Sequence, residues 1–313
     1  MFKSGSAERH PLSSLLLLFS LFLACAAIFG LLGLGIAAIT YGLESNIKEF
    51  DSIAFPLESI RIIQIVSSFG MFVVTALLFA KSESKQWISF LNFKKTRPVL
   101  LILTVLIMLS IGPMMEFIND LNKNMVLPEA LKEIEVWMKL KEEQMLEMTK
   151  QLLVMNSFNI FLINILMLAI IPALGEELIF RACLQKVFAR WTGNYHIAIW
   201  ITAIIFSAIH FQFYGFLPRM VLGALFGYML VWSGSIWVPI LAHFLNNGIA
   251  TLGAYVIQQK GKSIENVFEP DPASIPVFIA STLAFVALIW YFYYYTVNSK
   301  ENNIELSDGS RLD

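Results

Sequence analysis

Charged residues are scarce in this chain of 313 residues. They make up 14% of it, against about a quarter of an ordinary soluble domain, whereas hydrophobic residues make up 57%. The formal net charge is −1, so neither a nucleic-acid surface nor a tail of single-sign charge is expected. This composition excludes an ordinary soluble globule and favours a protein embedded in a lipid bilayer.

Cysteine is also scarce, and several hydrolase motifs are missing. The two cysteines, Cys25 and Cys183, fall inside apolar segments, so neither is expected in an exposed disulfide. The sequence has no His-Glu-x-x-His, no Gly-x-Ser-x-Gly and no aspartate within an apolar segment. These absences exclude a metalloprotease helix of that type, a serine nucleophile elbow and an intramembrane aspartate pair.

Long apolar runs recur along the chain, and each bilayer crossing needs about 20 apolar residues. We therefore predict an all-α, multi-pass membrane bundle of about eight transmembrane helices, with the active site inside the bundle. The first run is too long for a signal peptide, so we keep it as a helix. Residues 1–297 are expected to form the integral membrane domain and residues 298–313 an unstructured cytoplasmic tail. The predicted spans are residues 13–42, 60–80, 98–116, 157–188, 197–215, 217–232, 236–257 and 275–296.

The basic residues indicate an orientation. With the N-terminus inside, the inner connections hold more Lys and Arg per residue than the outer ones, so both termini are expected in the cytoplasm. The bias depends mainly on Lys81, Lys85, Lys94, Lys95 and Arg97.

One outer connection, 117–156, has its own apolar pattern. Apolar residues recur there at helical spacing between Glu and Lys, which predicts an amphipathic helix on the outer surface. These residues are Leu127, Leu131, Ile134, Trp137 and Met138.

A few strongly polar residues interrupt the apolar runs, and such residues are costly inside a bilayer. Glu177 and Arg181 are four apart, so they can form an ion pair on one helix face. Glu176 is rotated about 100° from that face and has no basic partner on its own helix. His243 and Asn247 are also four apart and share one stripe of another helix.

Depth along the helices brings some of these groups together. Glu176 and His210 each lie about 20 Å from the inner ends of their helices, and His243 lies about 12 Å from its own. We therefore expect the heads of Glu176, His210 and His243 to converge at one point in the bundle. This expectation requires the helix that starts near residue 157 to continue through its charged residues.

Two kinds of chemistry suit such a cluster. Glu176, His210 and His243 could hold a divalent metal such as Zn²⁺, whose bound water becomes a nucleophile. Alternatively, Glu176 alone could take a proton from water while a histidine orients that water. In both schemes a second histidine and the amide of Asn247 could stabilise an oxyanion. Both schemes hydrolyse an amide bond inside the membrane.

Three motifs in this order resemble a known family. Glu176-Glu177-Leu-Ile-Phe-Arg181 matches Glu-Glu-x-x-x-Arg, Phe206-Ser-Ala-Ile-His210 matches Phe-x-x-x-His, and His243-Phe-Leu-Asn-Asn247 matches His-x-x-x-Asn. Together they resemble the CPBP family of CAAX prenyl proteases and bacteriocin-processing (Abi) proteins, over about residues 155–256.

The resemblance implies a role for each matching residue. Glu176 would be the general base or a metal ligand, and His210 would act with it on the water. His243 and Asn247 would stabilise the oxyanion, or His243 would bind the metal, while Glu177 and Arg181 would support the helix. The implied protein is an intramembrane endopeptidase that resembles CAAX-type prenyl proteases. Its expected substrate is a membrane-associated peptide or protein, and its expected location is a bacterial cytoplasmic membrane.

Two other classes of function compete with the enzyme. A non-catalytic membrane scaffold or immunity-type binding protein would keep the same fold and polar pocket without turnover. A small transporter or proton relay would also use Glu and His in helices, but transporters usually show related halves or broken helices. The sequence shows no such symmetry, so the scaffold is the stronger alternative.

Overall fold

The computed structural model describes residues 9–42, 56–268 and 273–309, and these ranges contain helices and turns but no β-strand. The predicted all-α class is confirmed. The helical elements are α1 (Pro11–Tyr41), α2 (Leu57–Ser68), η1 (Phe69–Val74), α3 (Thr75–Glu83), α4 (Trp87–Phe90), α5 (Pro98–Ser110), α6 (Gly112–Lys123), η2 (Glu129–Leu131), α7 (Lys132–Leu152), α8 (Phe158–Asn164), η3 (Ile165–Ile170), α9 (Ile171–Glu176), η4 (Glu177–Leu184), α10 (Gln185–Thr192), α11 (Tyr195–Ala208), η5 (Phe213–Gly215), α12 (Phe216–Ser233), α13 (Trp237–Gln259), α14 (Glu265–Phe268) and α15 (Ile275–Gly309).

Six helices in the described ranges are long and apolar enough to cross a membrane, or seven if the bent pair α5–α6 counts as one span. The protein is therefore a multi-pass membrane protein. The six are Pro11–Tyr41, Leu57–Glu83, Phe158–Thr192, Phe213–Ser233, Trp237–Gln259 and Ile275–Asn298.

Two of the eight predicted spans differ from the structure. The span expected at 98–116 is broken, because α5 and α6 meet at 46°. Pro113 at the start of α6 has no N–H to continue the helix ladder, which explains the bend. The span expected at 197–215 is the short helix α11, whose 14 residues cover only about 21 Å. It ends because Phe211 adopts a left-handed conformation, with φ of 52°.

The C-terminal segment also departs from the prediction. Residues 298–313 were expected to be unstructured, but α15 continues to Gly309. Extending an existing helix needs no new nucleus, so the end of a transmembrane helix can run on past the apolar segment. Residues 310–313 lie outside the described ranges, as do residues 1–8 at the other end of the chain.

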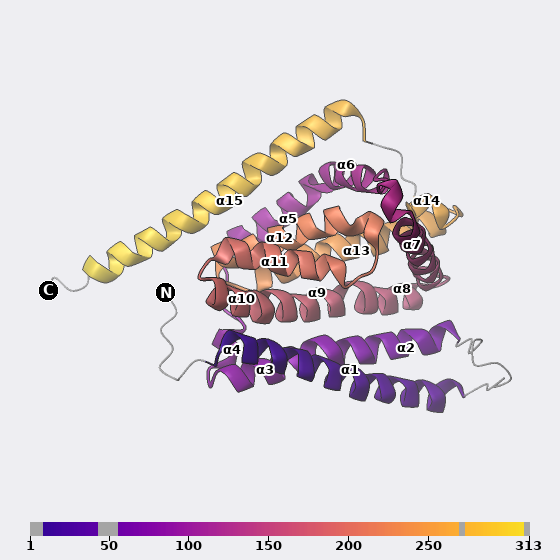
Figure 1. Cartoon of the computed structure of the whole chain (residues 1–313). Helices are drawn as coiled ribbons and strands as arrows, with labels where there is room; N and C mark the ends of the chain where they lie inside the picture. Colours follow the sequence, from indigo (N-terminus) through magenta and orange to yellow (C-terminus); the bar gives the residue numbers. More distant parts are fainter. Residues whose placement is uncertain (1–8, 43–55, 269–272, 310–313) are drawn as a thin grey trace.

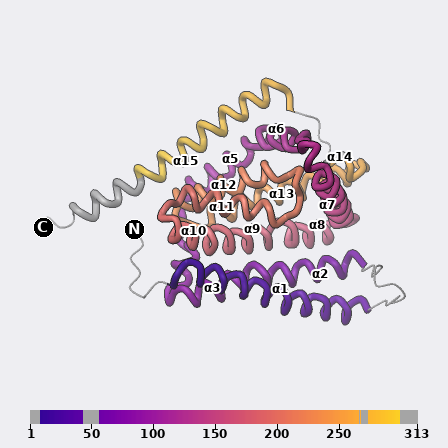
Figure 2. Tube along the Cα trace, in the orientation of Figure 1, coloured from indigo at the N-terminus to yellow at the C-terminus, as the bar shows by residue number. Residues whose placement is uncertain are grey.

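The helices pack in layers (Figures 1 and 2). One layer holds α1 to α3, and the next holds the long helix from α8 to α10. Beyond it lie α11 to α13, then α5 and α6, with α15 on the far side (Figure 1). The apolar spans of α1 and α15 are only 11% and 6% buried, as expected of helices that face lipid. Cys25 and Cys183 are buried and free, as predicted.

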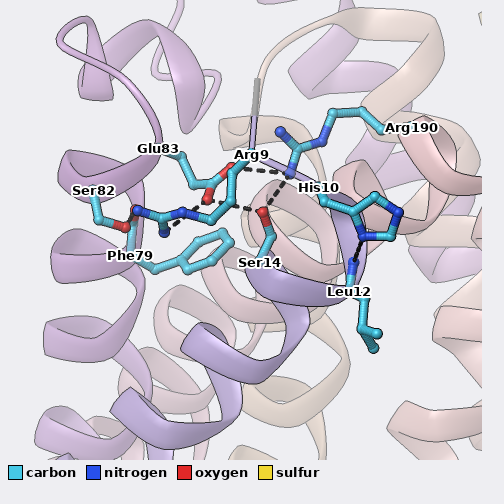
Figure 3. A network of polar contacts seen from close by, with 8 residues as sticks. All are labelled: Arg9, His10, Leu12, Ser14, Phe79, Ser82, Glu83 and Arg190. Atoms are coloured by element: carbon cyan, nitrogen blue, oxygen red, sulfur yellow. Dashed lines mark hydrogen bonds and ion pairs between the residues drawn. The ribbon is translucent and has the colours of Figure 1, made fainter. Parts of the chain in front are cut away.

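A polar network fastens the long helix to the first layer at one end of the bundle (Figure 3). The carboxylate of Glu83, at the end of α3, lies 2.9 Å from Nη2 of Arg190 and 3.2 Å from Nη1 of Arg9. Ser14 on α1 donates to Glu83 at 2.9 Å and accepts from Arg190 at 3.1 Å. These contacts join α1, α3 and α10, and so fix the long helix that carries the site.

The helix α7 lies across the opposite end of the bundle from α10 (Figure 1). Trp137 packs on the ring of Phe213 with centroids 5.3 Å apart, and Glu142 accepts from the backbone N–H of Tyr214 at 3.2 Å. The predicted amphipathic helix therefore exists, but it begins at Lys132. Leu127 lies in the connection after α6, and Leu131 lies in the short 3₁₀ turn η2 that precedes α7.

Candidate active site

The long helix that carries Glu176 continues through its charged residues. It runs from Phe158 to Thr192, which confirms the premise of the depth argument. Two of its segments, η3 and η4, are π-helical, and η4 begins at Glu177. Such π-helical turns widen the helix and are frequent at functional sites.

Glu177 is the centre of a buried ionic chain. Its side chain is fully buried, and its Oε1 lies 3.0 Å from Nη1 of Arg181, so the predicted ion pair is confirmed. The same oxygen lies 2.8 Å from Nδ1 of His243 on α13. Arg181 also donates from Nη2 to the carbonyl of Gly223, and its guanidinium stacks 4.4 Å above the ring of Phe206. The long helix therefore meets α13 through Glu177 and α12 through Arg181.

The buried side chains of Arg181 and Gln185 explain why α12 has glycines at positions 223 and 227. A Cβ at Gly223 would lie 3.3 Å from Nη2 of Arg181, and a Cβ at Gly227 would lie 2.7 Å from Oε1 of Gln185. Arg181 and Gln185 each donate to the carbonyl of the glycine they approach. The glycines thus let two buried polar side chains reach the backbone of α12.

Glu176 faces the other nitrogen of the same imidazole. Its Oε2 lies 3.9 Å from Nε2 of His243, and its side chain is 13% exposed. In the described part of the chain it forms no ion pair with a lysine or arginine. A separation of 3.9 Å is too long for a direct hydrogen bond but suits a bridging water. Because Nδ1 of His243 donates to Glu177, Nε2 is the nitrogen that remains for a water or a ligand.

His210 lies where α11 ends. Its Nδ1 is 2.7 Å from the carbonyl oxygen of Phe206, so Nδ1 carries a proton and Nε2 is left with a lone pair. The ring of Phe206 makes edge-to-face contacts with His210 and His243, with centroids 5.1 and 6.1 Å away. No hydrogen bond or ion pair within the described ranges joins His210 to Glu176. The structure thus brings Glu176 and His243 together, and the ring of Phe206 contacts both His210 and His243.

Asn247 is held by a carbonyl that a proline leaves free. Pro172 in α9 has no N–H to give to the carbonyl of Leu168, four residues earlier. Nδ2 of Asn247 donates to that carbonyl at 3.0 Å. One of the two amide hydrogens is therefore used between helices, and the second remains for a ligand.

The donors do not form a metal site by themselves. No group of three or more His, Cys, Asp or Glu side chains in the described residues is arranged to hold a metal ion. Glu176 and His243 supply two donors 3.9 Å apart, and no hydrogen bond or ion pair in the described ranges joins His210 to either. The predicted divalent metal therefore stays a prediction.

Two features of the site were not predicted from the sequence. The bond between Glu177 and His243 joins residues on different helices, so no spacing within one helix could indicate it. The second is the place of Arg219 at the start of α12, whose guanidinium donates to Gln212 in the turn after α11. A positive charge within an apolar segment was the signal for it.

Comparisons with known proteins find similarity over the segment that carries the three motifs. Residues 158–249 match the model described as type II CAAX prenyl endopeptidase Rce1-like. Over 90 residues the chain is 31% identical to the "Uncharacterized protein YpbD" of Bacillus subtilis (strain 168). These 90 residues are 28% of this chain. The chain spans 43% of the length of that relative. No solved structure matches the chain. Residues 158–249 are therefore similar to the Rce1-like family of type II CAAX prenyl endopeptidases.

Proposed function

We propose that this protein is an intramembrane endopeptidase that hydrolyses a peptide bond with water, in the manner of CAAX-type prenyl proteases. One observation carries the proposal. Glu176 faces Nε2 of a histidine whose Nδ1 is held by a second carboxylate, Glu177, which is itself paired with Arg181. A purely structural ion pair would need only Glu177 and Arg181.

The charges of this cluster link the base to the oxyanion donor. The net charge of the cluster is zero when Glu176 and His243 share one proton, because Glu177 and Arg181 neutralise each other. Burial favours the neutral cluster, because uncompensated charge is costly in an apolar environment. When Glu176 is ionised and able to act as a base, His243 is therefore protonated and presents Nε2–H as a donor.

The reaction follows from these protonation states. Glu176 takes a proton from a water while the oxygen of that water forms a bond to the carbonyl carbon of the substrate. Nε2 of His210 accepts the second hydrogen of the water and so orients it. The oxyanion accepts from Nε2–H of His243 and from the free amide hydrogen of Asn247. Glu176 then gives its proton to the amide nitrogen as the carbon–nitrogen bond breaks, and the products are a carboxylic acid and an amine.

The substrate, membrane and orientation belong to the same proposal. The substrate is a membrane-associated peptide or protein, and the protein lies in a bacterial cytoplasmic membrane with both termini in the cytoplasm. In Figure 1 the start of α1 and the end of α15 lie toward one end of the bundle, which supports this topology.

The test is turnover by the purified full chain in lipid nanodiscs. Internally quenched peptides, with and without a prenyl group, are incubated with wild type, His210→Ala and Asn247→Ala. We expect turnover by wild type and a loss of about 100-fold or more in both variants. The exposed Asn159→Ala on α8 is the matched control and should keep wild-type turnover.

The same assay separates the rival functions and the metal. No turnover of any peptide, or equal turnover in all variants, contradicts the protease and favours a non-catalytic scaffold. Turnover that survives a strong chelator supports water activation by Glu176 alone. Turnover that disappears on chelation and returns with Zn²⁺ assigns the predicted metal to Glu176, His210 and His243.

A further inference from the structure

The turn that follows His210 holds an arginine beside the candidate site. Arg219, in the first turn of α12, is partly buried. Its Nη2 donates to Oε1 of Gln212 at 2.8 Å, and its Nη1 donates to the carbonyl of Gln212 at 3.4 Å. A Cβ at Gly215 would lie 3.1 Å from Nη2, so the guanidinium packs closely against a position without a side chain. The turn therefore fixes where this cation lies.

Arg219 differs from other arginines of the described chain in its partners. Four of these arginines lie within 4 Å of a glutamate: Arg9 and Arg190 with Glu83, Arg61 with Glu58, and Arg181 with Glu177. Within the described ranges Arg219 forms no such ion pair, and both of its hydrogen bonds go to the neutral Gln212.

Donors of Arg219 remain free for a ligand. A guanidinium has five N–H donors in a planar fork, and Gln212 accepts two of them. Glu142 and Glu176 act on Arg219 through their charge without pairing with it. Glu176 already faces His243, and Glu142 accepts from the backbone of Tyr214. A charge inside an apolar segment needs a partner or a purpose, and in the described chain no carboxylate forms an ion pair with Arg219.

We propose that Arg219 binds a carboxylate of the substrate next to the bond that is cut. This inference rests on the proposed function and adds a specificity residue to it. The planar fork of a guanidinium matches a carboxylate with two parallel hydrogen bonds, and such charge-assisted bonds are strong where water is scarce. Arg219 lies one helical turn before Gly223, whose carbonyl accepts from Arg181 and whose Cβ position lies 3.3 Å from the ring of Phe206, so the bound carboxylate lies near the reacting peptide bond. The carboxylate is either the C-terminus of the peptide or a side chain of Asp or Glu.

The test measures peptide binding as well as turnover, using the full chain in nanodiscs. Three fluorescent peptides share one sequence: one ends in a free carboxylate, one ends in an amide, and one ends in an amide but carries an added glutamate. Dissociation constants are measured in the Glu176→Gln background, where the peptide stays intact, and KM and kcat are measured with Glu176 present. Arg219→Gln removes the cation, Arg219→Lys keeps the charge without the fork, and the exposed Lys260→Gln is the matched control for one lost charge.

We expect a carboxylate to improve binding by about 10- to 100-fold over the plain amide. Arg219→Gln should erase this advantage through KM while leaving binding of the amide peptide unchanged. Arg219→Lys should keep part of the advantage, and Lys260→Gln should keep all of it. If the peptide with the free C-terminus binds more tightly than the peptide with the added glutamate, the site recognises the terminal carboxylate. If the two peptides bind equally tightly, the site also recognises a side-chain carboxylate.

Two results would overturn the inference. Equal affinity of wild type for all three peptides excludes carboxylate recognition even if no Arg219 variant folds. Equal weakening of all three peptides by Arg219→Gln shows that Arg219 only holds the turn through Gln212. Selective binding without turnover would instead contradict the endopeptidase and keep the carboxylate site, so the two failures are distinguishable.

Discussion

The buried ionic chain gives a sharp prediction about stability. Arg181 is 1% exposed and Glu177 is fully buried, so neither charge has water to replace its partner. Replacing Arg181 with methionine keeps much of the volume of the side chain but leaves Glu177 with only the imidazole of His243. Removing one partner of a buried ion pair costs about 3–5 kcal/mol of the free energy of unfolding.

The double variant Glu177→Gln with Arg181→Met tests whether the two charges are coupled. It removes both charges at once, and a glutamine oxygen can still accept from Nδ1 of His243. We expect the double variant to be more stable than Arg181→Met alone, because no unpaired charge is left buried. We also expect its turnover to stay low, because a neutral glutamine no longer favours the protonated form of His243.

The assay is unfolding of the protein in detergent for the wild type, both single variants and the double variant. The free energies form a double-mutant cycle that isolates the coupling between Glu177 and Arg181. Additive losses, with the double variant less stable than either single variant, would refute the argument that the two charges compensate each other.

Two further predictions concern packing and pH. Gly175→Ala would place a Cβ 2.6 Å from Cβ of Phe72, so we expect a loss of about 1–3 kcal/mol in unfolding free energy. Gly253→Ala, with no atom within 4 Å of the new Cβ, is the control, and an equal loss there would contradict this packing. The hydrogen bond from Lys139 holds the pKa of Glu135 on α7 below its usual range. The stabilising effect of this carboxylate is therefore present above its unfolded pKa of about 4.3 and is lost as the pH falls through the native pKa. The difference in melting temperature between wild type and Glu135→Gln should shrink over that range, and a constant difference would show that Glu135 contributes no such effect.

Much of the fold could be predicted because single helices carry the information. Apolar length identified most spans, and the spacing of Glu177 and Arg181 predicted their ion pair, which the structure confirms. The failures come from local breaks that apolar length does not detect. Pro113 bends one predicted span, and the left-handed Phe211 ends another early.

The site was harder to predict because its contacts cross helices. Spacing on α13 placed His243 and Asn247 on one stripe, but could not show that Glu177 orients His243. The depth count brought Glu176 and His243 to one level, yet depth says nothing about rotation around the helix axis. For that reason the count could not show that the ring of Phe206 contacts both His210 and His243.

The central claim is that Glu176 activates the water that cuts the peptide. The most direct measurement compares kcat of wild type and Glu176→Gln in nanodiscs, with thermal unfolding and peptide binding measured on the same samples. The account predicts a fall in kcat of about 10²- to 10⁴-fold for Glu176→Gln, with unfolding and binding unchanged. Turnover by Glu176→Gln equal to that of wild type would contradict it.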